Sequence, residues 1–141
     1  MRNLRRRAEQ GFTLLELLVV LAIMGMLAAI IAPQVIKYLG TSRTQTAKVQ
    51  VQNVMQGLEL FRVDVGRYPT QQEGLIALVN PTPSAPNWNG PYLKKESALQ
   101  DPWGNPYIYQ IPGQHGEVDV YSLGQDKAPG GIGEAQDVGS W

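Results

Sequence analysis

The sequence predicts an α+β protein in which one long N-terminal helix packs on a small antiparallel β-sheet of about three strands, followed by a C-terminal loop region. Three observations lead to this prediction. An uncharged apolar stretch lies near the N-terminus, the next stretch repeats apolar residues every three or four positions, and most of the 15 glycines and ten prolines lie beyond residue 65. The first two patterns are typical of helices, and the third indicates a head of short strands and turns.

The apolar stretch is long enough to cross a membrane. Twenty residues without a charge separate Glu16 from Lys37, and a helix of that length spans about 30 Å, the thickness of the hydrocarbon core. We therefore expect residues 12–36 to form a transmembrane helix. The cluster of arginines upstream of it predicts a cytoplasmic N-terminus and a head on the opposite side; these are Arg2, Arg5, Arg6 and Arg7.

Beyond the membrane segment, the helix is predicted to continue to about residue 65. Pro33 lacks a backbone donor and is expected to bend or locally open the helix, with Gly40 as a second weak point. An amphipathic stripe then faces a core, and Gly66 is placed to end the helix in a left-handed conformation. The stripe consists of Ala47, Val51, Val54, Leu58, Phe61 and Val65.

Residues 37–141 are predicted to form one small head that includes the amphipathic half of the helix. Thr70 and Glu73 have the spacing of a capping box, which predicts a short helix through Leu78. Four prolines make residues 80–91 a loop. Short strands are expected at 92–93, 106–111 and 118–122, the last two forming a hairpin.

Composition excludes several functional classes. Beyond Gly11 the chain has eight basic and eleven acidic residues, a net charge of −3, so no basic surface predicts nucleic-acid binding. The absence of cysteine excludes disulfides and thiol chemistry. The single histidine, His115, lies in a glycine-containing turn and is expected to be solvated, and no serine has a nucleophile motif around it. We therefore expect no enzymatic activity.

The basic leader, followed by Gly-Phe-Thr-Leu-Leu-Glu at residues 11–16 and then the apolar run, resembles the class III signal of type IV pilins and pseudopilins. The resemblance implies that a prepilin peptidase removes residues 1–11 by cutting after Gly11 and methylates Phe12. The apolar helix would then stay on the mature chain, whereas a secretory signal peptide would be discarded. It also implies that Glu16 pairs with the terminal amine of a neighbouring subunit. The alternative is a Glu16 that is merely solvated near the membrane interface.

Motifs in the head indicate one branch of this family. Tyr-Pro-Thr at 68–70, Asp-Pro-Trp-Gly-Asn at 101–105 and Tyr-Ser-Leu-Gly at 121–124 look like those of the major pseudopilins of type II secretion, a branch of the type IV pilin-like superfamily. The resemblance implies a subunit of a helical homopolymer, the periplasmic pseudopilus that drives protein export. Its partners would be further copies, the prepilin peptidase and methylase, minor pseudopilins and the inner-membrane assembly platform.

The same resemblance implies a calcium site in the last twenty residues. Asp126 and Asp137 would lie at its ends, with backbone carbonyls of Leu123 and Ala128 and the carboxylate of Glu134 as further ligands. Oxygen ligands on a glycine-rich loop suit Ca²⁺. The alternative is a flexible, solvated loop from which only Trp141 docks on the head.

Two other functions remain open from the sequence. One is a membrane-tethered monomeric binding module, which the loop at 80–91 and the tryptophans in loops would serve. The other is a surface type IV pilus used for adhesion or DNA uptake. The absence of cysteine and the head motifs favour the pseudopilus.

Overall fold

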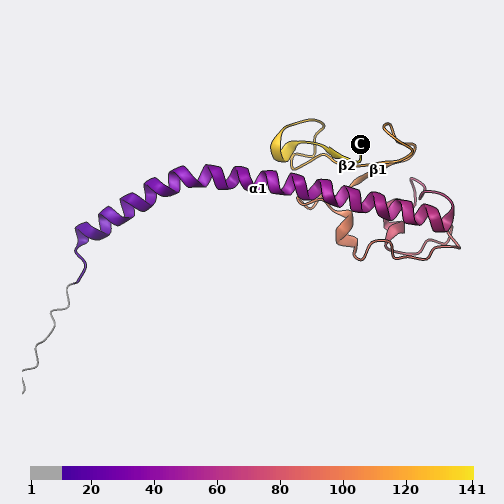
Figure 1. Cartoon of the computed structure of the whole chain (residues 1–141), viewed down its shortest axis with the longest axis horizontal. Helices are drawn as coiled ribbons and strands as arrows, with labels where there is room; N and C mark the ends of the chain where they lie inside the picture. Colours follow the sequence, from indigo (N-terminus) through magenta and orange to yellow (C-terminus); the bar gives the residue numbers. More distant parts are fainter. Residues whose placement is uncertain (1–10) are drawn as a thin grey trace, which may run out of the picture. The chain divides into compact units, whose positions relative to one another are not determined.

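The computed structural model describes residues 11–141, apart from the side chains of Lys37 and Leu39. Helix α1 (Leu14–Val65) is followed by strands β1 (Ile108–Gln110), β2 (Asp119–Ser122) and β3 (Val138–Gly139) and by three short 3₁₀ helices (Figure 1). The 3₁₀ helices are Leu75–Leu78, Glu96–Leu99 and Gly133–Ala135. The described chain divides into two compact units, one ending at Lys37 and one running from Tyr38 to Trp141. The predicted α+β class is confirmed, and residues 1–10 of the predicted leader, with its arginines, lie outside the described residues.

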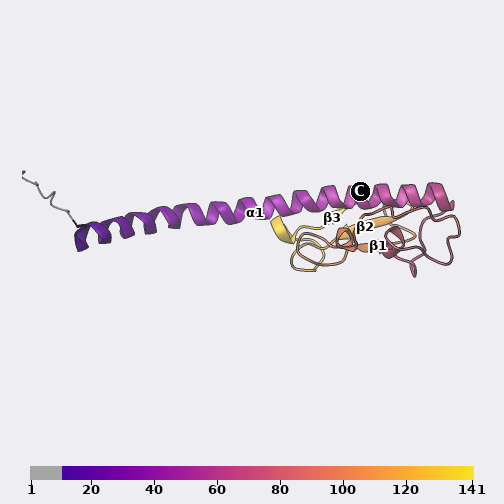
Figure 2. The same ribbon diagram turned by 90° about the horizontal axis from the view of Figure 1, so that it is seen from below.

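The second half of α1 carries the core of the head. Strands and loops lie along it in both views (Figures 1 and 2). Five stripe residues are at most 1% exposed, and Val65 is half-buried at the end of the helix; the five are Ala47, Val51, Val54, Leu58 and Phe61. Gly66 follows with φ 83°, where a residue without Cβ is favoured. The predicted stripe and helix end are both confirmed.

The sheet has three antiparallel strands in the order β1-β2-β3. Tyr109 lies opposite Val120 in the predicted hairpin, and Ser122 lies opposite Val138. The strand predicted at 92–93 is wrong, because Tyr92 and Leu93 instead donate their N–H groups to the carbonyl of Leu78, at 2.8 and 3.1 Å. The C-terminal segment supplies the third strand and thereby ties the end of the chain to the sheet.

Gly57 is a buried glycine of α1 on which Leu78 and Leu93 of the head pack. A Cβ added at this position would be 3.4 Å from side-chain atoms of Leu78 and of Leu93. A glycine inside a helix costs about 1 kcal/mol relative to alanine. At this distance an added Cβ would make an ordinary van der Waals contact, so the packing of these leucines does not by itself explain the glycine.

Two adjacent residues of α1 provide a matched test of this core. Replacing the fully buried Phe61 with alanine leaves a cavity and is expected to destabilise the head by about 3–5 kcal/mol. Leu60 is 55% exposed, so Leu60→Ala is expected to cost less than about 0.5 kcal/mol. Urea unfolding followed by near-UV circular dichroism measures both, and equal costs would contradict the assignment of the buried face.

Glu73 joins the loop at 80–91 to the end of the helix. It forms the predicted capping box, because its Oε2 accepts the Thr70 N–H at 2.7 Å and its own N–H donates to Thr70 Oγ1 at 3.2 Å. Arg67 donates to both of its carboxylate oxygens, at 2.7 and 2.9 Å, and Ser84 donates to Oε1. The segment it opens is a turn followed by the 3₁₀ helix Leu75–Leu78, so the predicted short helix through Leu78 is present as a 3₁₀ helix.

These hydrogen bonds make the head sensitive to acid. The bonds from Arg67, followed by those from Ser84 and the Thr70 backbone, hold the pKa of Glu73 well below its ordinary value. A carboxylate with a lowered folded-state pKa stabilises the fold above its unfolded pKa of about 4.3 and loses that contribution as pH falls further. Glu73→Gln is therefore expected to cost about 2 kcal/mol at pH 7. The difference from the unmodified chain should shrink below about pH 4.

Thermal unfolding of both chains between pH 7 and pH 2 measures this effect. Glu96 is exposed, so Glu96→Gln serves as the control and should follow the unmodified chain throughout. A stability difference for Glu73→Gln that stayed constant down to pH 2 would contradict a role for the ionised carboxylate.

Candidate functional site

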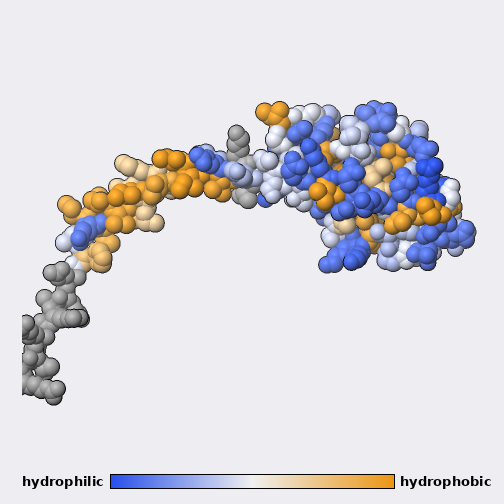
Figure 3. All heavy atoms as spheres, viewed as in Figure 1, coloured by the Kyte–Doolittle hydropathy of each residue, from blue (hydrophilic) through white to orange (hydrophobic). Residues whose placement is uncertain are grey.

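The first half of α1 has no apolar partner within the described chain. Every large apolar side chain from Leu14 to Ile36 is between 47% and 87% exposed, and Figure 3 shows this part of the helix as an almost uninterrupted hydrophobic surface. The helix is long and apolar enough to cross a membrane. An exposed apolar surface of this extent requires lipid or other protein around it.

Glu16 lies on the first turn of this exposed helix, in a second capping box. Its Oε2 accepts the N–H of Thr13 at 2.9 Å and the hydroxyl of Thr13 at 3.2 Å, while the Glu16 N–H donates to Thr13 Oγ1 at 3.2 Å. This box was not among the predicted features, although Thr-x-x-Glu before an apolar run is its usual signal. Gly11, Phe12 and Thr13 are all exposed beside it. The structure therefore gives Glu16 a local role in addition to the predicted one.

Pro33 does not interrupt α1. The helix is continuous through both Pro33 and Gly40, so the local opening that we expected at Pro33 is not present in the described chain. The physical reason is that proline has a helix-compatible φ and removes only one hydrogen bond. The carbonyl four residues before Pro33 loses its intrahelical donor, and the helix remains weaker at this point.

Two of the acidic residues that were predicted to bind calcium, Asp126 and Glu134, have other hydrogen-bond partners in the structure. Asp126 is exposed and accepts the backbone N–H of Ala128 at 3.2 Å. Glu134 instead accepts hydrogen bonds from Arg43 at 3.5 Å and from the Trp103 indole at 3.4 Å. Nowhere in residues 11–141 do three or more histidine or acidic side chains form a group that could hold a metal ion.

Asp137 nevertheless has the free oxygen that a cation site needs. Its Oδ2 accepts the N–H of Gly130 at 2.9 Å, whereas its Oδ1 is buried and accepts no hydrogen bond from the described part of the chain. Leu123, Pro129 and Asp137 line one cavity. A buried carboxylate oxygen without a donor is costly, and a hard cation held by it and by nearby carbonyls removes that cost. Asp137 and Leu123 therefore fit a calcium ion.

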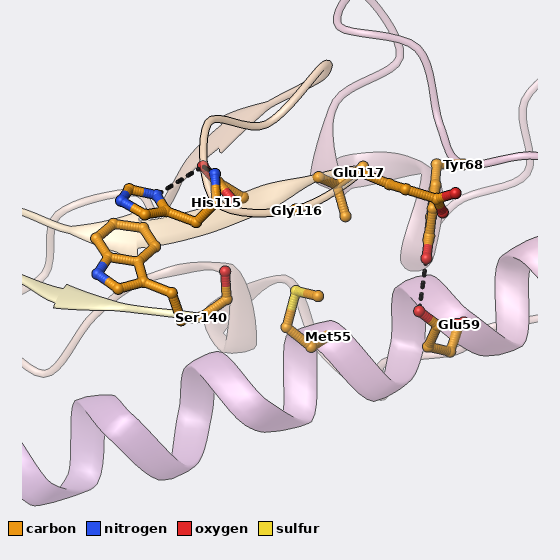
Figure 4. A pocket seen from close by; sticks show the side chains of 10 residues that line it. Met55, Glu59, Tyr68, His115, Gly116, Glu117 and Ser140 are labelled. Carbon is orange, nitrogen blue, oxygen red and sulfur yellow. Dashed lines mark hydrogen bonds and ion pairs between the residues drawn. The ribbon is translucent and has the colours of Figure 1, made fainter.

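A separate cavity of about 230 Å³ lies between α1 and the turn that precedes β2 (Figure 4). His115 is exposed in a turn, as expected, but its ring also has two partners. Its Nδ1 is 3.1 Å from Asp119 Oδ2, and its ring stacks on Trp141 with 3.8 Å between ring centroids. On the helix side, the Tyr68 hydroxyl donates to Glu59 at 2.6 Å. This arrangement fastens the C-terminal Trp141 to the hairpin.

Asp119, at the start of β2, is a buried acidic residue of this region. Burial alone would raise its pKa, but hydrogen bonds from the backbone N–H groups of Gln114 and His115, together with the His115 ring, lower the pKa of Asp119 below its ordinary value. These donors belong to a turn whose shape is not readable from residue types. Asp119 therefore stabilises the turn, and its carboxylate is already engaged by these donors.

The loop tryptophans are committed to the head. The Trp88 indole donates to the carbonyl of Ala77 at 2.7 Å, and both Trp88 and Trp103 are half-buried against the core. Trp88 and Trp103 therefore hold their loops against the core. The main support for a monomeric ligand-binding module is weakened accordingly.

Comparisons with known proteins agree with this architecture. The family model "Type II secretion system (T2SS), protein G" matches residues 34–141, and the "Prokaryotic N-terminal methylation motif" matches residues 6–32. The type II secretion system core protein G of Pseudomonas aeruginosa is 43% identical over 142 residues, covering 98% of this chain and 99% of the relative. That of Aeromonas hydrophila is 38% identical, with 98% and 96% covered.

A solved structure is also similar. The major pseudopilin from the type 2 secretion system of enterohaemorrhagic Escherichia coli matches with a TM-score of 0.58 and 32% identity, over 71% of this chain and 87% of that one. The long helix, the small sheet and the methylation motif define a pilin-like structural subunit, and not an enzyme. The chain belongs to the type II secretion system protein G family and is a structural subunit of a pseudopilus, as the sequence motifs predicted.

Proposed function

We propose that the chain is cut after Gly11, methylated at Phe12, and assembled from the inner membrane into a helical periplasmic pseudopilus whose growth drives protein export. The observation that carries this proposal is the apolar first half of α1, exposed on every side. The processing enzyme would be a prepilin peptidase and methylase. The remaining partners would be further copies of the chain, minor pseudopilins and the inner-membrane assembly platform.

Assembly follows from the physics of this helix. Outside a bilayer its apolar side chains are covered only when other copies surround them, so packing of helix on helix replaces lipid. A head-to-tail contact between identical chains propagates and does not close, which produces a filament. The head, whose own core is complete along residues 47–61 of α1, would remain on the outside.

Glu16 would give this packing its register. A carboxylate inside an apolar bundle is costly unless a counter-ion accompanies it. Cleavage after Gly11 creates an ammonium group on Phe12, four residues before Glu16. The same ammonium group on a neighbouring copy would neutralise Glu16 in the assembled filament.

Calcium would order the C-terminal loop. Asp137 supplies a buried oxygen without a donor, and the Leu123 carbonyl, Asp126 and the Ala128 carbonyl would complete the ligand set after a local adjustment. Glu134 would not be a ligand, because its Oε1 already accepts hydrogen bonds from Arg43 and Trp103. A bound cation would supply positive charge to the loop and would link Leu123, which follows β2, to Asp137, which precedes β3.

Calcium titration tests this site. At a concentration of one hundred times Kd, binding to the folded state adds about 2.7 kcal/mol, which raises Tm by several degrees. We expect this increase in the unmodified chain relative to an EGTA-treated sample, and its loss in Asp137→Asn. Glu96→Gln, which changes a carboxylate outside the loop, should keep it. An equal Tm with calcium and with EGTA would contradict the proposal.

Electron microscopy tests the proposed function as a whole. Membranes that overproduce the chain together with a prepilin peptidase should carry filaments, and membranes without the peptidase should carry none. A processed chain that forms no filaments would favour the membrane-tethered binding module. Filaments that extend from the cell surface in wild-type cells would favour a type IV pilus.

A further inference from the structure

The C-terminal loop contacts α1 one turn beyond the membrane segment. Thr44 Oγ1 donates to the carbonyl of Gly133 at 3.1 Å, and Arg43 Nη1 donates to Glu134 Oε1 at 3.5 Å. The partners of these two hydrogen bonds are separated by 89 and 91 positions in the sequence. We call this contact between Gly40–Thr44 and Gly133–Glu134 the latch.

Gly40 gives Glu134 its place in the latch. A Cβ on Gly40 would lie 2.7 Å from Cγ of Glu134, so any larger residue would push the glutamate away. Among residues 40–46, Gly40 and Thr44 are the buried positions, and both face Gly133–Glu134. The 3₁₀ helix Gly133–Ala135 therefore covers this turn of α1.

The covered turn is intrinsically weak as a helix. Pro33 upstream cannot donate a backbone hydrogen bond, and residues 40–46 include a glycine, a serine and three threonines, which are poor helix formers. Two of the threonines, Thr44 and Thr46, direct their hydroxyls back to the carbonyls of Gly40 and Ser42, at 3.2 and 2.9 Å, a bond that slightly destabilises and often bends helices. Contacts from outside the helix must supply the missing stability.

Glu134 connects this turn to the rest of the head. Its Oε1 also accepts the Trp103 indole N–H at 3.4 Å, and its backbone carbonyl accepts the N–H of Gln125 at 2.8 Å. Its side chain is 25% exposed, against 52% for Arg43. Glu134 is thus fixed by hydrogen bonds to the head, and through Arg43 it contacts helix α1.

We propose that Glu134 is a positioning residue that controls whether the turn Gly40–Thr44 of α1 is helical. With the latch closed, helix α1 is continuous past Pro33. With the latch open, the turn Gly40–Thr44 loses its helical hydrogen bonds. A role for the latch during assembly rests on the proposed pseudopilus function, in which subunits leave the bilayer and change their neighbours.

Hydrogen exchange of the full, processed chain in detergent micelles tests the latch. We expect Glu134→Ala, which removes every side-chain bond of the latch glutamate, to speed amide exchange in residues 40–46 by about tenfold. Arg43→Ala removes only a half-exposed ion pair and should speed it by about fivefold or less. Neither variant should change exchange in residues 51–61. Gln136→Ala alters an exposed side chain on the same loop and should leave exchange unchanged. The charge-swapped pair Arg43→Glu with Glu134→Arg should restore only the part of the protection that the ion pair supplies, because an arginine at position 134 cannot accept the Trp103 indole N–H.

Three results would overturn the proposal. One is unchanged exchange at residues 40–46 in Glu134→Ala. Another is an equal increase at residues 51–61, which would mean that the whole head opens. The third is an EGTA-treated unmodified chain that matches Glu134→Ala, with no further increase in the variant, because Glu134 would then act through calcium. The measurement uses unassembled chains, so a failure of the pseudopilus proposal remains distinguishable from a failure of the latch.

Discussion

Replacing Glu16 with glutamine is expected to abolish filament assembly while leaving the first turn of α1 intact. Glutamine preserves the capping box that Glu16 forms with Thr13, because either residue type serves at this position. Only the charge is lost. If the carboxylate neutralises the terminal ammonium of a neighbour, its removal leaves an unpaired charge in an apolar bundle, a cost of several kcal/mol per subunit. Counting filaments by electron microscopy measures the effect.

Thr13→Ala provides the matched control for this variant. It removes the hydroxyl of the capping box at a cost of about 1 kcal/mol and leaves the Glu16 charge in place. We expect it to assemble. The opposite pattern, with Glu16→Gln forming filaments and Thr13→Ala forming none, would show that Glu16 acts as a helix cap and would exclude the pairing.

Replacing Gly11 with leucine is expected to block processing completely and, with it, assembly. The side chain itself is tolerated by the folded chain, because a Cβ at Gly11 would meet nothing within 4 Å. Any effect therefore arises at the peptidase. Without cleavage, Phe12 has an amide nitrogen and no ammonium group, so Glu16 has no counter-ion. Mass spectrometry should find a chain beginning at Phe12 in the unmodified protein and only the full-length chain in the variant.

Gly25→Ala serves as the control for processing. Gly25 also has nothing within 4 Å of an added Cβ, but it lies in the helix, away from the cut. We expect this variant to be processed like the unmodified chain. A Gly11→Leu protein that begins at Phe12 would contradict the assignment of the cleavage position.

The helix and the head core could be predicted because their signals are local. Apolar residues at helical spacing identify the buried face that ends near Val65, and Gly66 marks the helix end. The third strand could not be predicted in this way. Val138 and Gly139 form only a two-residue strand, and their pairing with β2 depends on the course of the whole C-terminal loop. Tyr92 and Leu93 have the residue types of a strand, but their N–H groups bond to Leu78.

Some features of the candidate sites could likewise be predicted from the sequence, and others could not. The exposed apolar helix and the position of Glu16 follow directly from sequence, and the capping box at Thr13 could have been found from its spacing. The engagement of Glu134 with Arg43 could not, since the two residues are 91 positions apart. Likewise, the donors that surround Asp119 are backbone N–H groups of a turn, which residue types do not reveal. Long-range contacts decide which acidic residues of the loop remain free for a cation.

The central claim is that Glu16 of one subunit pairs with the Phe12 amine of another. The structure of the assembled filament, determined by cryo-electron microscopy at side-chain resolution, tests it most directly. We expect the Phe12 nitrogen of one copy within about 4 Å of a Glu16 carboxylate oxygen of a neighbouring copy. A filament in which these atoms lie beyond about 8 Å, the screening length in physiological salt, with water around the carboxylate, would contradict the claim.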